Sequence, residues 1–556
     1  MSLDSLPALP LVQIANSLAL LDRLRLAQTS RSIREELFAA HTLWNRVSVT
    51  HTSHQPSLLW DRVKIILDLA NSVPTHVRIE NPVALNGDAH WNHLRDWLRS
   101  ARTLDLSLSG ATWFGPRGSH MNWASRGQRL DEVRQVQLNL FCALDAAPEL
   151  EVLSVNAMPS QSSENLELPD TFLVNSSQSK PLRMCWLTGM SLANGVQYAA
   201  FRNVTSLVYS SGLDELDLSE LETILDNMPL LEELAVDCHS FEGSHGRVLP
   251  AHDHLRRVLL NQMSDDGPAQ LARLLLSVGD FYVHNNYTLP ASLYDAWPNG
   301  PIDFMMGTNI IRVVGASEEV PGQIRRFTWV RDPVRQSRTF TDELFLPETH
   351  AHRLRSLTLH ESQWPDAVHA LPELFGLTDM TIVLSTCCER RTGFHLGIPS
   401  RDEALPLFGR GKPALRVPAL QHLKLYAGER ESDGLKGRCV VDWGTSGSPY
   451  RCGDGCVLAI DDLRDLLERL LDRTGSEHRM LASLILGGVK VDGDQKNESL
   501  KQFAQAIERL EAAPLAIVQQ CKDRINKDHL FFTDVGRRLE ETFEGMEVAS
   551  DNPLRK

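Results

Sequence analysis

A short apolar motif recurs along most of this 556-residue chain and constrains its fold more than any other feature. Apolar residues occupy the first, fourth and sixth positions of each copy, with the spacing L-x-x-L-x-L. The copies begin at Pro74, Ala101, Leu150, Leu182, Val204, Leu231, Leu255, Val278, Ile324, Leu354, Leu377, Leu420 and Leu481. The steps from Val204 to Leu231, Leu255 and Val278 are 27, 24 and 23 residues, a period typical of stacked structural repeats.

The segments between the copies predict that each unit is a short strand followed by a helix or an irregular return. Helical patterns occupy residues 57–70, 220–227 and 460–471. One such unit cannot cover its own apolar face, so the units must stack with parallel strands. Residues 47–500 therefore resemble an irregular leucine-rich-repeat solenoid, an α/β horseshoe that binds a substrate or partner. A generic α/β domain with apolar buried strands is the alternative, because the spacing is degenerate.

The first fifty residues carry a different pattern, which predicts three short helices. Apolar residues at steps of three and four share one face of the first helix, at Leu11, Ile14 and Leu18. Asp22 is the expected N-cap of the second helix. Ser32 and Glu35 have the spacing of a capping box, so we expect the third helix to begin there and to run to about residue 40.

Residues 1–46 resemble an F-box. The residues that carry the resemblance are Leu6, Pro7, Ile14, Leu18, Asp22, Leu24, Arg25, Leu26, Ala27, Arg31, Leu43 and Trp44. The resemblance implies that this module docks on the Skp-type adaptor of a cullin-RING complex. The protein would then be the substrate-receptor subunit of an SCF-type E3 ubiquitin ligase, with an unknown protein target on the repeats. The expected adaptor-binding residues are Leu6, Pro7, Leu11, Ile14, Leu18 and Leu24.

A second interpretation makes the three helices only a cap on the first repeat. The protein would then be a leucine-rich-repeat interaction scaffold that is not coupled to ubiquitination. Two departures from the F-box pattern motivate it: Leu9 stands where an acidic residue is usual, and Arg23 stands where an apolar residue is usual. Amphipathic three-helix patterns also occur in many unrelated proteins.

Stretches rich in Gly, Ser, Pro and Asn interrupt the repeats at residues 107–127, 156–181, 284–309 and 427–456. Loops at the edge of a rigid scaffold are common binding elements. The third stretch carries aromatic residues of the kind that anchor interfaces, namely Tyr287, Tyr294, Trp297 and Phe304. We predict that these residues form a target-binding loop. Aromatic residues that fold back onto the neighbouring repeat are the alternative.

The chain after the repeats, residues 501–556, predicts a capping helix and a tail. Helical spacing extends from about residue 498 to 526, with a break near Pro514. Leu500, Phe503 and Ile507 are spaced to cover the last repeat. The final residues, from about Val548, are expected to form a tail.

Composition excludes several classes of partner. The formal net charge is −15, and no Lys/Arg-rich run interleaved with aromatic residues occurs, so we expect no nucleic acid partner. No secretory signal pattern and no run of 18 apolar residues is present, which predicts no membrane association. The nine cysteines are thinly spread, which is typical of reduced thiols in the cytoplasm or nucleus.

A search for catalytic patterns finds none with the required spacing. The sequence contains no G-x-S-x-G, P-loop, G-x-G-x-x-G after a strand, or H-E-x-x-H motif. Two clusters contain potential metal ligands, one of Cys439, Cys452 and Cys456 and one of Cys238, His239, His245, His252 and His254. Neither has a familiar zinc spacing. We expect no enzymatic activity, cofactor or metal, and a hydrolase or metalloenzyme that uses these clusters is the third alternative.

Overall fold

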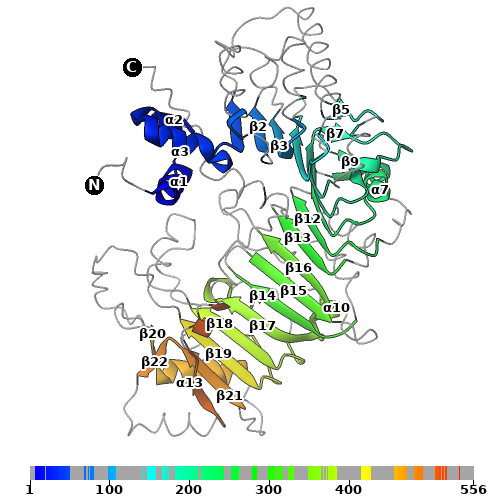
Figure 1. Cartoon of the computed structure of the whole chain (residues 1–556). Coiled ribbons are helices and arrows are strands. Elements are labelled where there is room, and N and C mark those ends of the chain that lie inside the picture. The colour runs from blue at the N-terminus through cyan, green and yellow to red at the C-terminus, as the bar shows by residue number, and fades with distance from the viewer. Residues whose placement is uncertain are drawn as a thin grey trace, which may run out of the picture. The chain divides into compact units, whose positions relative to one another are not determined.

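The computed structural model describes residues 7–18, 20–50, 68–70, 73, 75–80, 95, 98–107, 141, 144, 147–157, 166–170, 172–173, 182–210, 215–238, 240–242, 252–261, 278–284, 299–307, 310–316, 324–330, 348–364, 367–368, 371, 373–384, 415–427, 456–471, 481–492, 507–514, 516–518, 520–521 and 538. The chain divides into an N-terminal unit, residues 1–258 with 532–556, and a C-terminal unit, residues 259–531. Each unit contains a sheet of mostly parallel strands, which Figure 1 draws as arrows.

Three helices open the N-terminal unit: α1 (Ala8–Asn16), α2 (Leu20–Thr29) and α3 (Arg31–Ala39). A short 3-10 helix, η2 (His41–Leu43), leads from α3 to the first strand. The side chains that pack between the helices are Leu11, Ala15, Ala27, Ile33, Leu37, Leu43 and Trp44, each at most 2% exposed. The ring of Trp44 meets Phe38 edge to face at 5.6 Å. The helices therefore share an apolar core.

Two predicted helix starts are wrong. The Ser30 hydroxyl accepts the Ile33 N–H at 3.2 Å, so Ser30 is the N-cap of α3 and the helix begins one residue before Ser32. Asp22 lies in the first turn of α2, which begins at Leu20. Several polar residues near a helix start satisfy the same capping pattern, and the local path of the backbone decides which of them caps.

The strands of the N-terminal unit run parallel and pair in chain order. They are β1 (Arg46–Thr50), β2 (Thr75–Glu80), β3 (Ala101–Ser107), β4 (Val152–Asn156), β6 (Met184–Thr188), β8 (Ser206–Ser210) and β10 (Glu233–Asp237). Next to β10, the backbone N–H groups of Arg256 and Arg257 donate to the Glu232 carbonyl, where β12 (Arg257–Asn261) begins.

The register aligns the fourth and sixth motif positions into two apolar columns. The first column is Leu104, Leu153, Cys185, Leu207 and Leu234, and the second is Leu106, Val155, Leu187, Tyr209 and Val236. Each of these side chains is at most 1% exposed. Burial of one such side chain stabilises a fold by about 1.5–3 kcal/mol. The stacking of repeats therefore supplies the apolar core that a single repeat lacks. The predicted α/β class with parallel strands is confirmed.

The C-terminal unit has a mostly parallel sheet. In spatial order its strands are β13 (Asp280–His284), β16 (Ile324–Val330), β15 (Ile310–Ala316), β14 (Ile302–Met306), β17 (Leu354–His360), β18 (Asp379–Leu384), β19 (His422–Ala427), β21 (Ser483–Gly487) and β23 (Leu510–Ala512). Strand β15 runs antiparallel to both neighbours, and the other pairs are parallel. Within this unit the fourth motif positions also align into an apolar column, through Leu357, Met380, Leu423 and Leu484.

The β14–β15 hairpin corrects the predicted interruption at 284–309. The Gly307 N–H donates to the Ile310 carbonyl at 2.7 Å and closes the turn between the strands. Phe304 lies inside β14 opposite Val313 and is 1% exposed, so its predicted position on a loop is wrong. Ile302, Phe304 and Met306 alternate with other residues in a strand pattern that differs from the L-x-x-L-x-L spacing.

Glycine corners lead from some strands into short second pairs. Gly189 follows β6 with φ 68°, and Gly488 follows β21 with φ 65°, a backbone region that favours glycine. The short parallel pairs are β5 (Leu166–Glu167) with β7 (Met190–Ser191), β9 (Glu215–Asp217) with β11 (Ser240–Glu242), and β20 (Cys456–Ala459) with β22 (Val489–Asp492).

Helices on the return path bury leucines against the sheets. The helices are α7 (Leu218–Asn227) and α13 (Ile460–Leu470), and the shorter helical elements are η6 (Ala199–Phe201), α10 (Glu348–Ala351) and η8 (Glu361–Gln363). Asn227, which is 1% exposed, accepts the Tyr198 N–H at 2.6 Å and donates to the Val196 carbonyl at 3.0 Å. A single buried amide thus satisfies backbone groups at this bend.

The C-terminal segment departs from the predicted capping helix. Residues 510–512 form β23, which pairs with β21, and residues 516–518 are helical. Leu510 and Ala512 favour helix locally, but the edge of β21 supplies hydrogen bonds that a strand satisfies. Residues 532–556 belong to the N-terminal unit, and Arg538 is the part of them that the structure describes. No helix in the described segments is long and apolar enough to cross a bilayer.

Candidate interaction surfaces

Arg23 ties the three helices to the start of the first sheet. Its side chain is buried, and its guanidinium donates to the carbonyl oxygens of Leu18 at 2.8 Å, Leu43 at 2.6 Å and Asn16 at 3.1 Å. Since α1 ends at Asn16 and η2 at Leu43, these are carbonyls that lack partners within their helices. Burial, and then the charge of Arg46, lowers the pKa of Arg23.

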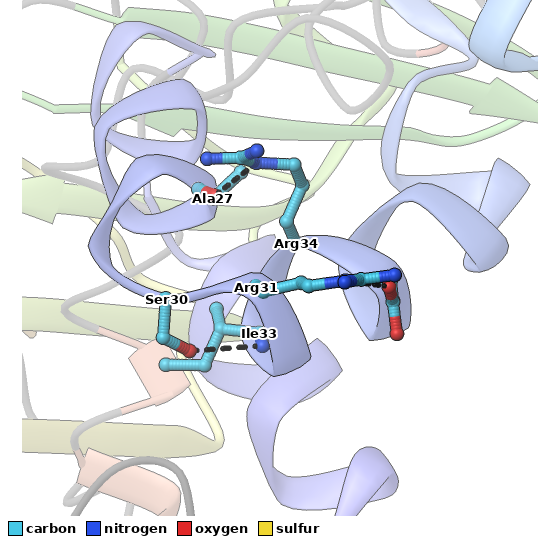
Figure 2. A network of polar contacts seen from close by, with 6 residues as sticks. Ala27, Ser30, Arg31, Ile33 and Arg34 are labelled. Carbon is cyan, nitrogen blue, oxygen red and sulfur yellow. Dashed lines mark hydrogen bonds and ion pairs between the residues drawn. The ribbon is translucent and has the colours of Figure 1, made fainter.

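A second set of polar contacts joins α2 to α3, as Figure 2 shows. Arg34 Nε donates to the Ala27 carbonyl at 3.1 Å, near the end of α2. Arg31 pairs with Glu35 at 2.8 Å on the exposed surface of α3. Together with the Ser30 cap, these bonds fix the turn between the two helices, so Pro7 to Trp44 form one packed element.

Three apolar residues at the start of α1 and along it reach solvent, and we call them the α1 edge: Pro7, Leu9 and Ile14. Leu9 is 69% exposed and Ile14 is 41% exposed. Pro7 precedes the helix and is also exposed. Large apolar side chains at this exposure are typical of binding surfaces when they occur together on one element.

The other predicted adaptor-binding residues occupy different environments. Leu11 is 2% exposed and packs inside the helical core, so it supports the shape of the module and does not reach its surface. Leu18 and Leu24 are half-buried. Leu6 lies outside the described residues. The sequence pattern therefore groups residues that the structure separates, because the same apolar spacing serves both a core and a docking face.

The N-terminal unit also has an apolar cluster on the sheet face opposite the apolar columns. Val152 packs with Met184, Trp186 and Val208 from the adjacent strands β6 and β8, and we call these four residues the Trp186 patch. Val152 is buried and the other three are half-buried. A tryptophan and a methionine on the polar face of a sheet are side chains that often anchor protein partners.

Ion pairs flank the Trp186 patch on both sides. The pairs are Arg78–Asp105 at 2.6 Å, Arg102–Glu151 at 2.6 Å and Arg257–Glu233 at 2.7 Å. Glu233 also accepts a hydrogen bond from the Ser206 hydroxyl at 3.3 Å. An apolar centre with a polar rim is the usual anatomy of a protein interface. The signal for this surface lies in the residues between the apolar motif positions, which the L-x-x-L-x-L spacing does not include.

The predicted target-binding loop is not assembled by the described residues. Phe304 is buried in β14. Tyr287, Tyr294 and Trp297 lie outside the described residues, and the loop stays a prediction for them.

Two histidines on the strand faces have hydroxyl partners, and their positions favour a structural role. His422 Nδ1 lies 2.8 Å from Ser483 Oγ, and the register places Asp379 on the strand next to His422. His76 Nδ1 lies 3.0 Å from Thr103 Oγ1. Both histidines occupy the third motif position, so the contact recurs with the repeat. A catalytic triad requires a hydrogen bond between Asp and His. Within the described chain Asp379 and His422 do not form one.

The predicted clusters of cysteine and histidine lie partly outside the described residues, at Cys439, Cys452, His239 and His245. Among the residues that are described, no group of three or more His, Cys, Asp or Glu side chains could hold a metal. His252 is buried with Nε2 3.1 Å from the Met228 carbonyl oxygen. Burial, and then the charge of Asp237, raises the pKa of Cys238 to about 12, so this thiol is protonated at neutral pH.

No model of a known protein family matches this chain, and no curated protein matches it.

Proposed function

We propose that this protein is the substrate-receptor subunit of an SCF-type cullin-RING ubiquitin ligase. In this proposal the F-box-like helices bind the Skp-type adaptor, and an irregular leucine-rich-repeat solenoid carries a protein target. The receptor performs no chemistry. Its contribution is proximity, because a tethered target meets the transferring thioester at a high effective concentration.

The observation that carries the proposal is the α1 edge on a helical module with its own core. Leu9 and Ile14 face solvent while Leu11 and Trp44 pack inside, so α1 presents two large apolar side chains that the described part of the module leaves exposed. Exposed apolar side chains on a short helix are expected to be buried by another polypeptide. The parallel sheets that follow, with the Trp186 patch, supply a second surface for a target.

Co-purification with the Skp-type adaptor tests this proposal. The double variant Leu9→Asp, Ile14→Asp places two charges on the α1 edge, and we expect recovery of the adaptor to fall by at least about tenfold. Leu230→Asp is the matched control, because Leu230 is an apolar residue of the same unit that is 40% exposed and lies outside the helices. Equal recovery by wild type and the double variant, at any level, contradicts the proposal.

A second candidate function is a leucine-rich-repeat scaffold whose helices only cap the sheet. The bond from Arg23 to the Leu43 carbonyl favours it, because this bond connects α2 to the residues that lead into β1. His41 Nδ1 also lies 2.7 Å from the carbonyl oxygen of Leu69, a residue that follows β1 in the chain and does not belong to the three N-terminal helices. The two functions differ in whether the sheet remains folded when the helices are removed.

A further inference from the structure

Strand β23 forms an edge of the sheet in the C-terminal unit. It pairs in parallel with β21, and among the described strands it has no second neighbour. The Leu484 N–H donates to the Arg509 carbonyl at 2.9 Å, and the Ala513 N–H donates to the Leu486 carbonyl at 2.8 Å. The odd-numbered residues of this segment therefore direct these backbone groups towards β21. Because the direction alternates along a strand, the N–H and C=O of Leu510 point to the free edge.

The apolar column of this unit ends exposed at the same edge. The register places Leu510 beside Leu484 and Ala512 beside Leu486. Leu484 is buried and Leu486 is half-buried, but Leu510 is 59% exposed and Ala512 is also exposed. Stacked repeats need a polar outer face where the stack ends. Strand β23 instead presents apolar side chains, which a further strand at this edge would cover.

Two side chains of opposite charge flank Leu510. Arg509 and Glu511 lie on the other face of the strand, since side chains alternate along it. They form an ion pair at 2.5 Å between Arg509 Nη2 and Glu511 Oε1, and the Arg509 side chain is 75% exposed. The order along the strand is cation, apolar residue, anion. A second copy of the strand that runs in the opposite direction presents the complementary order.

We propose that β23 pairs with β23 of a second copy of this chain, antiparallel, around a two-fold axis at Leu510. In this register Leu510 faces Leu510 of the second copy, and the two residues exchange both N–H···O=C bonds. Arg509 of each copy lies opposite Glu511 of the other. These are non-hydrogen-bonded pairs, in which side chains approach closely. The two sheets become continuous, and the two Leu510 side chains cover each other.

The charges favour this register over its neighbours. A two-fold axis at Arg509 places Arg509 opposite Arg509, and an axis at Glu511 places Glu511 opposite Glu511. Like charges directly opposite each other on paired strands are destabilising. An axis at Leu510 brings only opposite charges together. Since the same surface of both copies is used, the contact closes after two copies and forms a dimer.

Analytical ultracentrifugation of the full-length chain tests the inference. We expect a reversible equilibrium of monomer and dimer at concentrations between about 1 and 100 μM, because one short strand pair makes a small interface. Arg509→Glu places Glu opposite Glu511 in both pairs and should weaken the dimer by at least about tenfold. Glu511→Arg places Arg opposite Arg509 and should weaken it to a similar extent.

Exchange of the two charges separates pairing from a general effect on the fold. The double variant Arg509→Glu, Glu511→Arg restores opposite charges across the axis and should dimerise as wild type does. A mixture of the two single variants should form a mixed dimer for the same reason. Arg416→Glu is the matched control, because Arg416 is an exposed arginine of the same unit that pairs with Glu373. It should leave the dimer unchanged.

Circular dichroism establishes that each variant is folded, as expected for changes of exposed side chains. A monomer over the whole range of concentration overturns the inference. So does an undiminished dimer in folded Arg509→Glu, or a folded double variant that stays monomeric. The assay contains neither adaptor nor target, so its outcome is independent of the proposed function.

Discussion

At the scale of single residues, a buried charge can replace an apolar residue when backbone carbonyls surround it. Arg23 stands where the F-box pattern has an apolar side chain, and its guanidinium donates to the carbonyl oxygens of Asn16 and Leu43, at the ends of α1 and η2, and of Leu18, between α1 and α2. The departure is therefore a helix-capping device. Bonds to a charged donor are stronger than neutral ones, which offsets part of the cost of burying the charge.

Replacement of Arg23 should destabilise the helical module. Arg23→Met keeps the aliphatic stem and removes the donors to Leu18, Leu43 and Asn16, so we expect the free energy of unfolding to fall by about 2–4 kcal/mol. Arg25→Met is the control, because Arg25 pairs with Asp22 on the exposed surface. Its effect should stay below about 0.5 kcal/mol. Urea unfolding followed by circular dichroism measures both, and equal losses would contradict the capping role.

His76 should make the N-terminal unit less stable at acidic pH. Its pKa in the folded protein is about 4, below the unfolded value of 6.5, so the unfolded chain binds the proton more tightly. The stabilisation is complete above pH 6.5 and is lost as the pH falls towards 4. We expect His76→Gln to reduce this loss by about 1–2 kcal/mol. Melting temperatures between pH 7.5 and 4.5 measure it, with His254→Gln at an exposed turn as the control. Parallel pH profiles of wild type and His76→Gln would contradict the assignment.

At the scale of elements, each of the thirteen copies of the apolar motif assigned to the repeats coincides with a strand. The columns through Leu153, Leu207 and Leu357 place its fourth position in the core of both units. The motif did not identify the β14–β15 hairpin or β23. Those strands form because a neighbouring strand edge offers hydrogen-bond partners, and such pairing depends on residues far away in the chain.

The corner after β21 should tolerate only glycine. Gly488 has φ 65°, and an added Cβ would overlap the Ala427 carbonyl oxygen at the end of β19. We expect Gly488→Ala to reduce the free energy of unfolding by at least about 2–3 kcal/mol. Gly195→Ala is the matched control, because Gly195 has φ 76° and nothing within 4 Å of its added Cβ. It should lose only about 1 kcal/mol. Thermal unfolding measures the difference, and equal losses would show that the close approach at β19 is unimportant.

At the scale of the whole molecule, the helices and the first strands belong to one unit. Leu11, Leu37 and Trp44 are buried in the helical core, and Arg23 connects α2 to the Leu43 carbonyl. Both a docking module and a cap would have such a helical core and such a bond from Arg23 to Leu43. They differ in what happens to β1 and β2 when the helices are absent.

Deletion of residues 1–45 separates the two functions. If the helices are a docking module, the remaining chain should unfold cooperatively within about 5 °C of wild type, because an independent module can be removed without exposing the core of the sheet. If they are a cap, the deletion exposes the first strands and lowers the melting temperature by more than about 10 °C. Differential scanning calorimetry of both chains measures this. A large destabilisation would contradict the docking function and support the scaffold.

The spacing of apolar residues was sufficient to establish an α/β protein with stacked parallel strands and three N-terminal helices, because burial of periodic apolar faces depends mainly on local sequence. Tertiary structure decided which of those apolar residues are buried and which face solvent. It placed Leu11 in the core and Ile14 on the surface, and it turned Phe304 inwards. It also brought Arg46, His76 and Arg102 together from three strands. Contacts between distant segments depend on strand register and chain path, which one sequence does not reveal.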